Sequence, residues 1–318
     1  MTNTRMDRRT FTQLLVMSAA AAATPALPAW AQAKKRSVVI GHTGITWPGR
    51  TGGARGVPPP PPDPALNETI FKDVSELGFA GLELFDWQIN GLESQGLLSG
   101  FVEKYKLPLI SSYTSINLTD PAQRSTTIAS AVAVGKIMKK YGGKTIVIGP
   151  SGRVGGESYS YNEHKQNIVT TLNELGKAIT DIGLIAALHQ HTGTAVETRD
   201  ETYATMEAVD TRYVKFGPDI GQLQKGGVDP VGVVKTFLPV VQHMHFKDWV
   251  GGPSMAGYCP LGLGKVDLVG ILNLMEGRKL EGMIMVELDR GGEMPYAPRE
   301  TAQIAHDWLV KNGVAMKA

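Results

Sequence analysis

Short apolar runs alternate with longer amphipathic segments along most of this 318-residue chain. The runs are continuously apolar rather than alternately apolar and polar, which is typical of parallel strands buried on both faces. We predict eight such strands, at residues 38–43, 81–85, 108–113, 144–148, 184–188, 213–217, 240–245 and 282–287.

Segments with helical periodicity separate these runs, and several of them end at a glycine, as at Gly78, Gly142 and Gly183. Strict alternation of strands and helices indicates a parallel sheet, and eight pairs predict an α/β fold of the closed (β/α)8 TIM-barrel type. A doubly wound open sheet is the alternative, but no Gly-x-Gly-x-x-Gly motif follows the first strand. The predicted helices cover residues 65–77, 93–105, 121–141, 161–182, 199–209, 230–237, 266–278 and 298–311.

The first 33 residues have the pattern of an export signal. A twin arginine at residues 8–9 precedes an apolar run, and Ala-Gln-Ala ends at residue 33 as a small-residue cleavage site. The apolar run is about half of the ~20 residues that a membrane span needs. We therefore predict a twin-arginine signal peptide at residues 1–33 and a barrel at residues 34–318. The mature protein is then expected to be periplasmic or secreted, with no membrane anchor.

The charge balance limits the class of partner. The chain has 32 Lys+Arg and 30 Asp+Glu, and the leader holds three of the arginines and one of the aspartates, so 29 of each remain. No basic excess is left to hold a nucleic-acid backbone, which argues against a DNA-repair nuclease. We expect a small-molecule substrate, with a homo-oligomer left open. Cys259 is the only cysteine, so an internal disulfide is impossible.

Four of the seven histidines form two His-x-His pairs at the ends of predicted strands: His189 with His191, and His243 with His245. Strand residues two apart point to the same face, so each pair can aim both rings at one spot. Active sites of barrels form at the carboxyl ends of the strands.

Carboxylates stand at the neighbouring strand ends. Asp219 lies between the two histidine pairs, and Glu287 follows them. Histidine, aspartate, histidine and glutamate at four consecutive strand ends predict a site for one divalent metal ion. Mixed nitrogen and oxygen ligands suit Mn²⁺, Co²⁺, Fe²⁺ or Zn²⁺ better than Ca²⁺.

At these residues the chain resembles the sugar phosphate isomerase/epimerase superfamily, the xylose isomerase-like TIM barrels, and within it the inosose dehydratase-like branch. The resemblance covers nearly all of residues 38–312. It is most specific in His-Gln-His-Thr-Gly-Thr-Ala-Val-Glu-Thr, Gly-Pro-Asp-Ile-Gly-Gln-Leu, His-Met-His-Phe-Lys-Asp and Met-Val-Glu-Leu-Asp.

The resemblance implies Asp219, His245 and Glu287 as metal ligands. Many ketose epimerases of the superfamily place on strand five a glutamate that is both ligand and acid/base, whereas this chain has His189 there. Two arrangements remain open: His189 as the fourth ligand with His191 facing the substrate, or the reverse.

The family's chemistry is consistent with these residues. A metal that chelates a carbonyl oxygen and a neighbouring hydroxyl stabilises a developing enolate. Glu287, His189 or His191 would remove the proton alpha to that carbonyl. Because a base paired with an acid of a different type suits elimination, we predict a metal-dependent lyase or dehydratase. Its substrate would be a keto-sugar, keto-inositol or 3-oxo-glycoside. A sugar isomerase or epimerase is the alternative, and a non-catalytic periplasmic sugar-binding barrel is the second.

Other polar and aromatic residues near the strand ends are candidates for substrate binding. Imidazole and carboxylate groups would hydrogen-bond sugar hydroxyls, and an indole would stack on a sugar ring, with core packing as the alternative for each. Lys247 is expected to bind substrate or to pair with Asp248 beside the metal. The candidates are His42, Trp47, Glu83, His191, His243 and Lys247.

Overall fold

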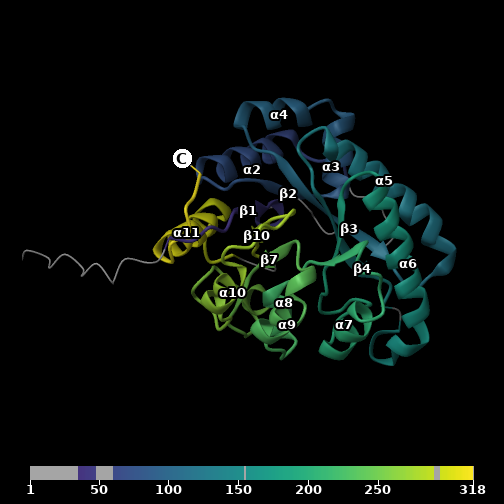
Figure 1. Cartoon of the computed structure of the whole chain (residues 1–318). Helices are drawn as coiled ribbons and strands as arrows, with labels where there is room; N and C mark the ends of the chain where they lie inside the picture. Colours follow the sequence, from purple (N-terminus) through teal and green to yellow (C-terminus); the bar gives the residue numbers. More distant parts are fainter. Residues whose placement is uncertain (1–34, 48–59, 154, 290–293, 318) are drawn as a thin grey trace, which may run out of the picture. The chain divides into compact units, whose positions relative to one another are not determined.

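The computed structural model describes residues 35–47, 60–153, 155–289 and 294–317. The predicted signal peptide lies outside the described residues. Eight parallel strands form one sheet in the order β6-β5-β4-β3-β2-β1-β10-β7, surrounded by helices (Figure 1). Their bounds are β1 Ile40–Thr43, β2 Leu82–Phe85, β3 Leu109–Asn117, β4 Thr145–Ser151, β5 Ile185–Leu188, β6 Val214–Phe216, β7 Met244–Phe246 and β10 Ile284–Val286.

The two ends of this sheet, β6 and β7, are joined as well. Isolated parallel bridges pair Phe216 with Val241 and Asp219 with His245. The backbone N–H of Gln242 donates to the Phe216 carbonyl at 3.1 Å, and that of His245 donates to the Pro218 carbonyl at 2.9 Å. The strands therefore close into a barrel, which confirms the predicted (β/α)8 fold.

Helices follow the strands as the sequence periodicity predicts, and several begin at side chains that favour a helix start. Asp63 caps α2 and Asp229 caps α9, each before a proline at the first helical position, and Thr198 caps α7. The helices are α2 Pro64–Glu76, α3 Asp86–Ser94, α4 Leu98–Tyr105, α5 Arg124–Lys139, α6 Tyr161–Asp181, α7 Arg199–Met206, α8 Ile220–Lys225, α9 Pro230–Thr236, α10 Leu268–Met275 and α11 Pro298–Lys311.

The structure differs from the prediction where elements are short. The single helix expected at 93–105 is two helices, α3 and α4, separated at Gly96, whose φ of +68° favours glycine. Helix α8 and the two-stranded hairpin of β8 Asp248–Trp249 and β9 Tyr258–Cys259 were not predicted. Six-residue and two-residue elements are too short to show a hydrophobic period.

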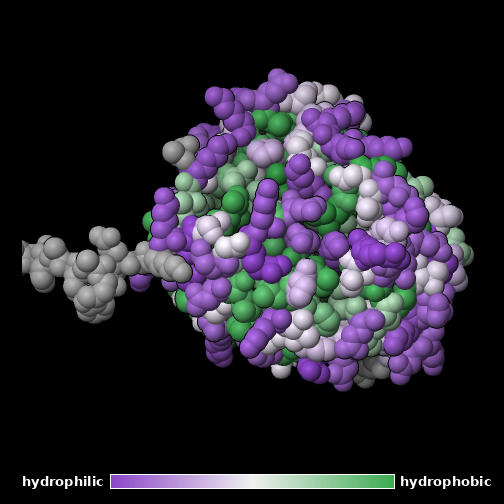
Figure 2. Space-filling model, in the orientation of Figure 1, coloured by the Kyte–Doolittle hydropathy of each residue, from purple (hydrophilic) through white to green (hydrophobic). Residues whose placement is uncertain are grey.

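Polar and apolar side chains are unevenly distributed over the exterior. Polar side chains dominate the outer helices in the view of Figure 2, with apolar side chains visible in patches nearer the middle of that face. Among the described helices, none combines the length and the apolar character that a bilayer-spanning helix needs.

Gly41 shows how little space strand β1 leaves inside the barrel. A Cβ added there would lie 2.7 Å from the Gly81 carbonyl oxygen and 2.7 Å from the Met285 sulfur. We predict that Gly41→Ala lowers the free energy of unfolding by about 1–3 kcal/mol, because the backbone must shift to admit the methyl group.

Urea denaturation checks this prediction, with Gly100→Ala as the matched control. Gly100 lies in α4, and a Cβ there would meet no atom within 4 Å. That variant should gain about 0.5–1 kcal/mol, since alanine favours a helix over glycine. Equal stability of Gly41→Ala and the wild type would contradict the prediction.

Candidate active site

A pocket with about 450 Å³ of empty space opens beyond the carboxyl ends of β1, β2, β5 and β10 and against β3. Its lining combines apolar side chains with imidazole and carboxylate groups. The described residues that line it are Thr43, Gly44, Ile45, Glu83, Leu84, Phe85, Tyr113, His189, His191, Glu287 and Asp289.

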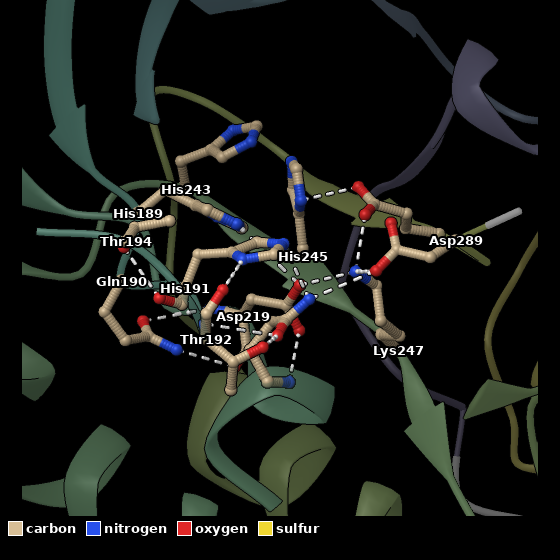
Figure 3. Close-up of polar contacts among 12 residues, drawn as sticks. His189, Gln190, His191, Thr192, Thr194, Asp219, His243, His245, Lys247 and Asp289 are labelled. Carbon is tan, nitrogen blue, oxygen red and sulfur yellow. Dashed lines mark hydrogen bonds and ion pairs between the residues drawn. The ribbon is translucent and has the colours of Figure 1, made fainter. Parts of the chain in front are cut away.

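Each His-x-His pair brings its two rings close together, as the strand periodicity predicts. The ring centroids of His189 and His191 are 5.8 Å apart, and those of His243 and His245 are 5.5 Å apart. The two pairs also meet, because the rings of His189 and His245 lie only 4.4 Å apart (Figure 3). Histidines separated by more than fifty residues in the sequence thus share one place in the barrel.

Asp219 follows β6 and uses its two carboxylate oxygens for different purposes. Oδ1 accepts a hydrogen bond from the Gln222 N–H at 3.0 Å and caps helix α8. Oδ2 lies 2.7 Å from Lys247 Nζ and 3.8 Å from His189 Nε2. The side chain of Gln190 holds the Asp219 backbone by donating to its carbonyl and accepting from its N–H. Oδ1 therefore stabilises the start of helix α8, whereas Oδ2 contacts the charged and imidazole groups of the site.

His245 lies between two carboxylates. Its Nε2 donates to Glu83 Oε1 at 2.8 Å, and its Nδ1 is 2.6 Å from Glu287 Oε2. Burial alone would lower the pKa of His245, but the charges of Glu287 and Glu83 raise it well above the ordinary value. Without a metal ion these carboxylates favour the protonated imidazole, which links β2, β7 and β10, and a metal bound to His245 would take the place of its proton.

Glu83 in β2 orients the second histidine pair. Its Oε2 accepts from the Ser111 hydroxyl at 2.5 Å and lies 3.1 Å from His243 Nε2, while Oε1 accepts from His245. Burial would raise the pKa of Glu83, but the charge of His245 and the hydrogen bond from His243 lower it. Both carboxylate oxygens have protein partners, and His243 is completely buried and does not line the pocket. Glu83 itself lines the pocket, so its predicted role in substrate binding stays a prediction, whereas His243 has no contact with that space.

Lys247 is completely buried among three carboxylates (Figure 3). Its Nζ lies 2.7 Å from Asp219 Oδ2, 2.6 Å from Glu287 Oε1 and 2.8 Å from Asp289 Oδ2. Burial opposes the charged form, yet the three carboxylates raise the pKa of Lys247 well above its usual value. The ammonium therefore remains protonated and does not accept a proton from a substrate.

Asp248, which we expected to pair with Lys247, has a different role. Its carboxylate accepts the backbone N–H groups of Trp249, Gly262, Gly264 and Val266 at 2.8–3.1 Å. Neighbouring strand residues point to opposite faces, so Asp248 holds the loop around the β8–β9 hairpin while Lys247 enters the interior. The expected Lys247–Asp248 ion pair is therefore wrong.

Glu287 and Asp289 bring two carboxylates of different basicity to the pocket. Burial raises the pKa of Glu287, although His245 and Lys247 oppose the shift. Burial acts in the same direction on Asp289, but the adjacent Lys247 lowers the pKa of that carboxyl to about 2. Of these two pocket carboxylates, Glu287 is the better proton acceptor.

Gln222 on α8 orients His191 at the pocket. His191 Nδ1 donates to the Thr192 carbonyl at 2.7 Å, and its Nε2 accepts from the Gln222 amide at 2.8 Å. The same amide donates to Asp289 Oδ2 at 3.1 Å, and its oxygen accepts from the Thr192 hydroxyl at 2.6 Å. Both ring nitrogens of His191 are thus fixed by protein groups.

The buried donors suit a divalent transition metal. One ligand atom each from His189, Asp219 and His245 lie within 4.8 Å of one another. His189 Nδ1 has no hydrogen-bond partner among the described residues. Two imidazoles with a carboxylate match the preferences of Zn²⁺, Mn²⁺, Co²⁺ or Fe²⁺. These three residues fit such an ion, and Glu287, the other predicted ligand, contacts the group through His245.

His42 and Trp47 lie away from the pocket, in the layer between the strands and the helices. His42 Nδ1 donates to the Thr43 carbonyl at 2.7 Å, and its ring packs edge-on against Trp47 and Phe79. Trp47 Nε1 donates to Asp73 of α2 at 2.9 Å. Both side chains are buried and neither lines the pocket, so their contacts are those of core residues.

Several residues of this site had no role predicted from the sequence, among them Asp289, Tyr113 and Tyr258. Asp289 was detectable, because it stands two residues after Glu287 and therefore on the same face. Tyr113 lies in the middle of β3 and packs against Gly149, where a Cβ would collide with its ring. Tyr258 comes from the unpredicted hairpin and lies over Lys247 Nζ at 4.9 Å from the ring centroid. Tyr113 stands at the end of the strand predicted at 108–113 but was given no role, and Tyr258 follows no predicted strand.

An α/β barrel with imidazoles and carboxylates gathered at the carboxyl ends of its strands has the architecture of a barrel-enzyme site. The chain belongs to the xylose isomerase-like TIM barrel family, whose pattern matches residues 71–312.

Similar proteins include dehydratases and an epimerase. The inosose dehydratase of Clostridium botulinum (strain Alaska E43 / Type E3) is 24% identical over 254 residues, which cover 72% of this chain and 85% of that protein. A probable 3-DHS dehydratase from Bacillus anthracis has a TM-score of 0.67 at 17% identity, covering 86% of this chain and 98% of its own. The 3-keto-D-glucoside 4-epimerase from E. coli has a TM-score of 0.64 at 14% identity, covering 86% and 99%. These structures share the fold.

The buried His42 generates a prediction about acid stability. Burial lowers its pKa from 6.5 to about 4, although the hydrogen bond to Thr43 opposes the shift. Between these values the unfolded chain binds a proton that the folded protein does not, so stability falls as the pH falls. The loss at this residue reaches about 3 kcal/mol at pH 4.

We predict that His42→Leu reduces the loss of stability between pH 6.5 and pH 4, relative to the wild type. Urea denaturation at several pH values measures it. His306→Leu, on the outer helix α11, serves as the control and should leave the pH dependence nearly unchanged. Parallel pH profiles for the His42→Leu variant and the wild type would contradict the prediction.

Proposed function

We propose that this protein is a metal-dependent dehydratase or eliminating lyase that acts on a small keto-cyclitol, keto-sugar or 3-oxo-glycoside. The observation that carries the proposal is the pocket lining. It places a carboxylate, Glu287, and two imidazoles, His189 and His191, around one cavity. Beside this cavity lies the buried group of candidate metal ligands, His189, Asp219 and His245.

His189, Asp219 and His245 would hold the ion, with Glu287 adjacent to them. A bound divalent cation would supply Lewis acidity to a substrate carbonyl oxygen. Glu83 supports this arrangement by accepting from Nε2 of His245, so that Nδ1, which lies beside Glu287, is the nitrogen that would bind the ion. Second carboxylates of this kind commonly orient metal-ligating histidines.

Glu287 is the candidate base and His191 the candidate acid. Glu287 would remove the proton alpha to the carbonyl. His191, protonated at Nε2 in place of the hydrogen bond that it accepts from Gln222, would donate that proton to the departing β-hydroxyl, which leaves as water. The C–H and C–O bonds break as a carbon–carbon double bond forms. His189 remains with the metal ligands, because its Nε2 faces Asp219 rather than Gln222.

Two observations favour elimination over epimerisation. The candidate base and acid are of different chemical types, a carboxylate and an imidazole, whereas strand five lacks the glutamate of many ketose epimerases. The similarity to inosose dehydratases also favours elimination, since the name of those proteins describes loss of water. The predicted leader would place this activity in the periplasm or outside the cell.

Metal analysis tests the donor group directly. We predict about one equivalent of transition metal in the reloaded wild-type protein and a large loss in Asp219→Ala and Glu287→Ala, because each variant removes a carboxylate from the buried group. Mass spectrometry after gel filtration measures the content. Glu281→Ala, an exposed carboxylate before β10, is the control and should retain the metal. Wild-type protein that binds no metal would contradict the proposed metal dependence.

Isotope exchange separates the roles of base and acid. We predict that Glu287→Gln loses both solvent deuterium exchange and elimination, by about 10²–10⁴-fold, because the proposed base is removed. His191→Asn should keep exchange and lose most elimination. NMR of keto-cyclitols and 3-oxo-glycosides in D₂O follows both reactions, with His306→Asn as a remote control.

The outcomes also distinguish the alternatives. Exchange and stereochemical inversion without elimination in every substrate would contradict the lyase and favour an epimerase. Binding without exchange or elimination would favour a sugar-binding barrel.

A further inference from the structure

Lys247 is an unusual neighbour for a metal site. An ammonium group that is completely buried contacts the two carboxylates, Asp219 and Glu287, that are proposed to serve a divalent cation. At Asp219 a single carboxylate oxygen would be shared by the ammonium and the metal ion. Asp219 Oδ1 is used by the cap of α8, so Oδ2 alone faces both Lys247 Nζ and His189 Nε2.

The barrel is built to hold this lysine in place. A Cβ on Gly221 would lie 2.7–2.9 Å from the Cβ, Cγ and Cδ atoms of Lys247, so the glycine of Gly-Pro-Asp-Ile-Gly leaves the space that the lysine stem fills. The Tyr258 ring lies over the ammonium at 4.9 Å, a favourable distance for a cation. Packing of the aliphatic stem against Gly221 therefore fixes the position of Lys247, together with the contacts of its ammonium group.

Asp289 gives the ammonium a partner of its own. Lys247 Nζ lies 2.8 Å from Asp289 Oδ2, and Asp289 does not belong to the buried donor group. Burying three carboxylates is unfavourable unless cations compensate them. The ammonium compensates one of these three carboxylates, and His245 is shared between Glu287 and Glu83, so negative charge remains for a divalent cation.

We propose that Lys247 is a resident cation that competes with the divalent metal for Asp219 and Glu287, while Asp289 retains the ammonium when the metal is bound. This inference rests on the proposed metal site. Lys247 then keeps the carboxylates compensated without metal, and its repulsion of the metal limits how tightly the ion binds.

Lys247→Met tests the inference, because methionine keeps the length of the stem and removes the charge. We predict that this variant binds Mn²⁺ or Zn²⁺ at least about tenfold more tightly than the wild type, since a like charge near the ion is gone. Its melting temperature should also rise more on metal addition than that of the wild type, because the ion alone now compensates the carboxylates. Calorimetric titration and thermal unfolding at one fixed pH measure the two effects. Lys225→Met is the control: Lys225 also lies over the Tyr258 ring at 4.9 Å but is exposed, and its loss should change neither quantity.

A second variant covers the case in which Lys247→Met does not fold without metal. Lys247→Met combined with Asp289→Asn removes one positive and one negative charge, and it should show the same tighter binding. Equal metal affinity in the wild type and both variants would overturn the inference and leave the proposed function standing.

Two other outcomes separate the inference from the proposed function. Metal binding by the variants but not by the wild type would support the inference and overturn the proposed metal dependence, since the lysine would then exclude the ion. Absence of binding in all three proteins would overturn both.

Discussion

Compensation of buried negative charge is the constraint on which the rest of this site depends. Glu83, Asp219, Glu287 and Asp289 lie inside one barrel, and isolated ionised carboxylates are very unfavourable there. Lys247 and His245 contact all four of them. The carboxylates come from β2 and from the segments after β6 and β10, whereas both cations come from β7 and the residue after it, so the charges are compensated only when the sheet is closed in the observed register.

The sequence predicted the fold and the proximity of the histidines and carboxylates because both depend on patterns that repeat over a few residues. Continuous apolar runs predicted the eight strands, and the spacing of two in His189/His191 predicted rings on one face. The same reasoning was less effective at β1, where proximity to a strand end did not reveal which face His42 occupies. Thr43, its neighbour, lines the pocket, whereas His42 packs against Phe79.

The residues that the sequence did not reveal depend on contacts between distant segments. The partners of Lys247 come from β6 and β10, and its neighbour Asp248 is turned toward the following loop. Nothing in His-Met-His-Phe-Lys-Asp distinguishes that choice from an ion pair between adjacent residues. Helix α8 was also missed, although the aspartate that caps it, Asp219, was predicted to be a site residue.

That cap connects the two halves of the pocket. Asp219 Oδ1 accepts the backbone N–H of Gln222, and the side chain of Gln222 holds His191 and Asp289. A single residue, Gln222, therefore lies between the Asp219 carboxylate and the His191 imidazole. The first turn of α8 thus connects the two groups, and a displacement of Asp219 would move Gln222 and, with it, the hydrogen-bond partner of His191.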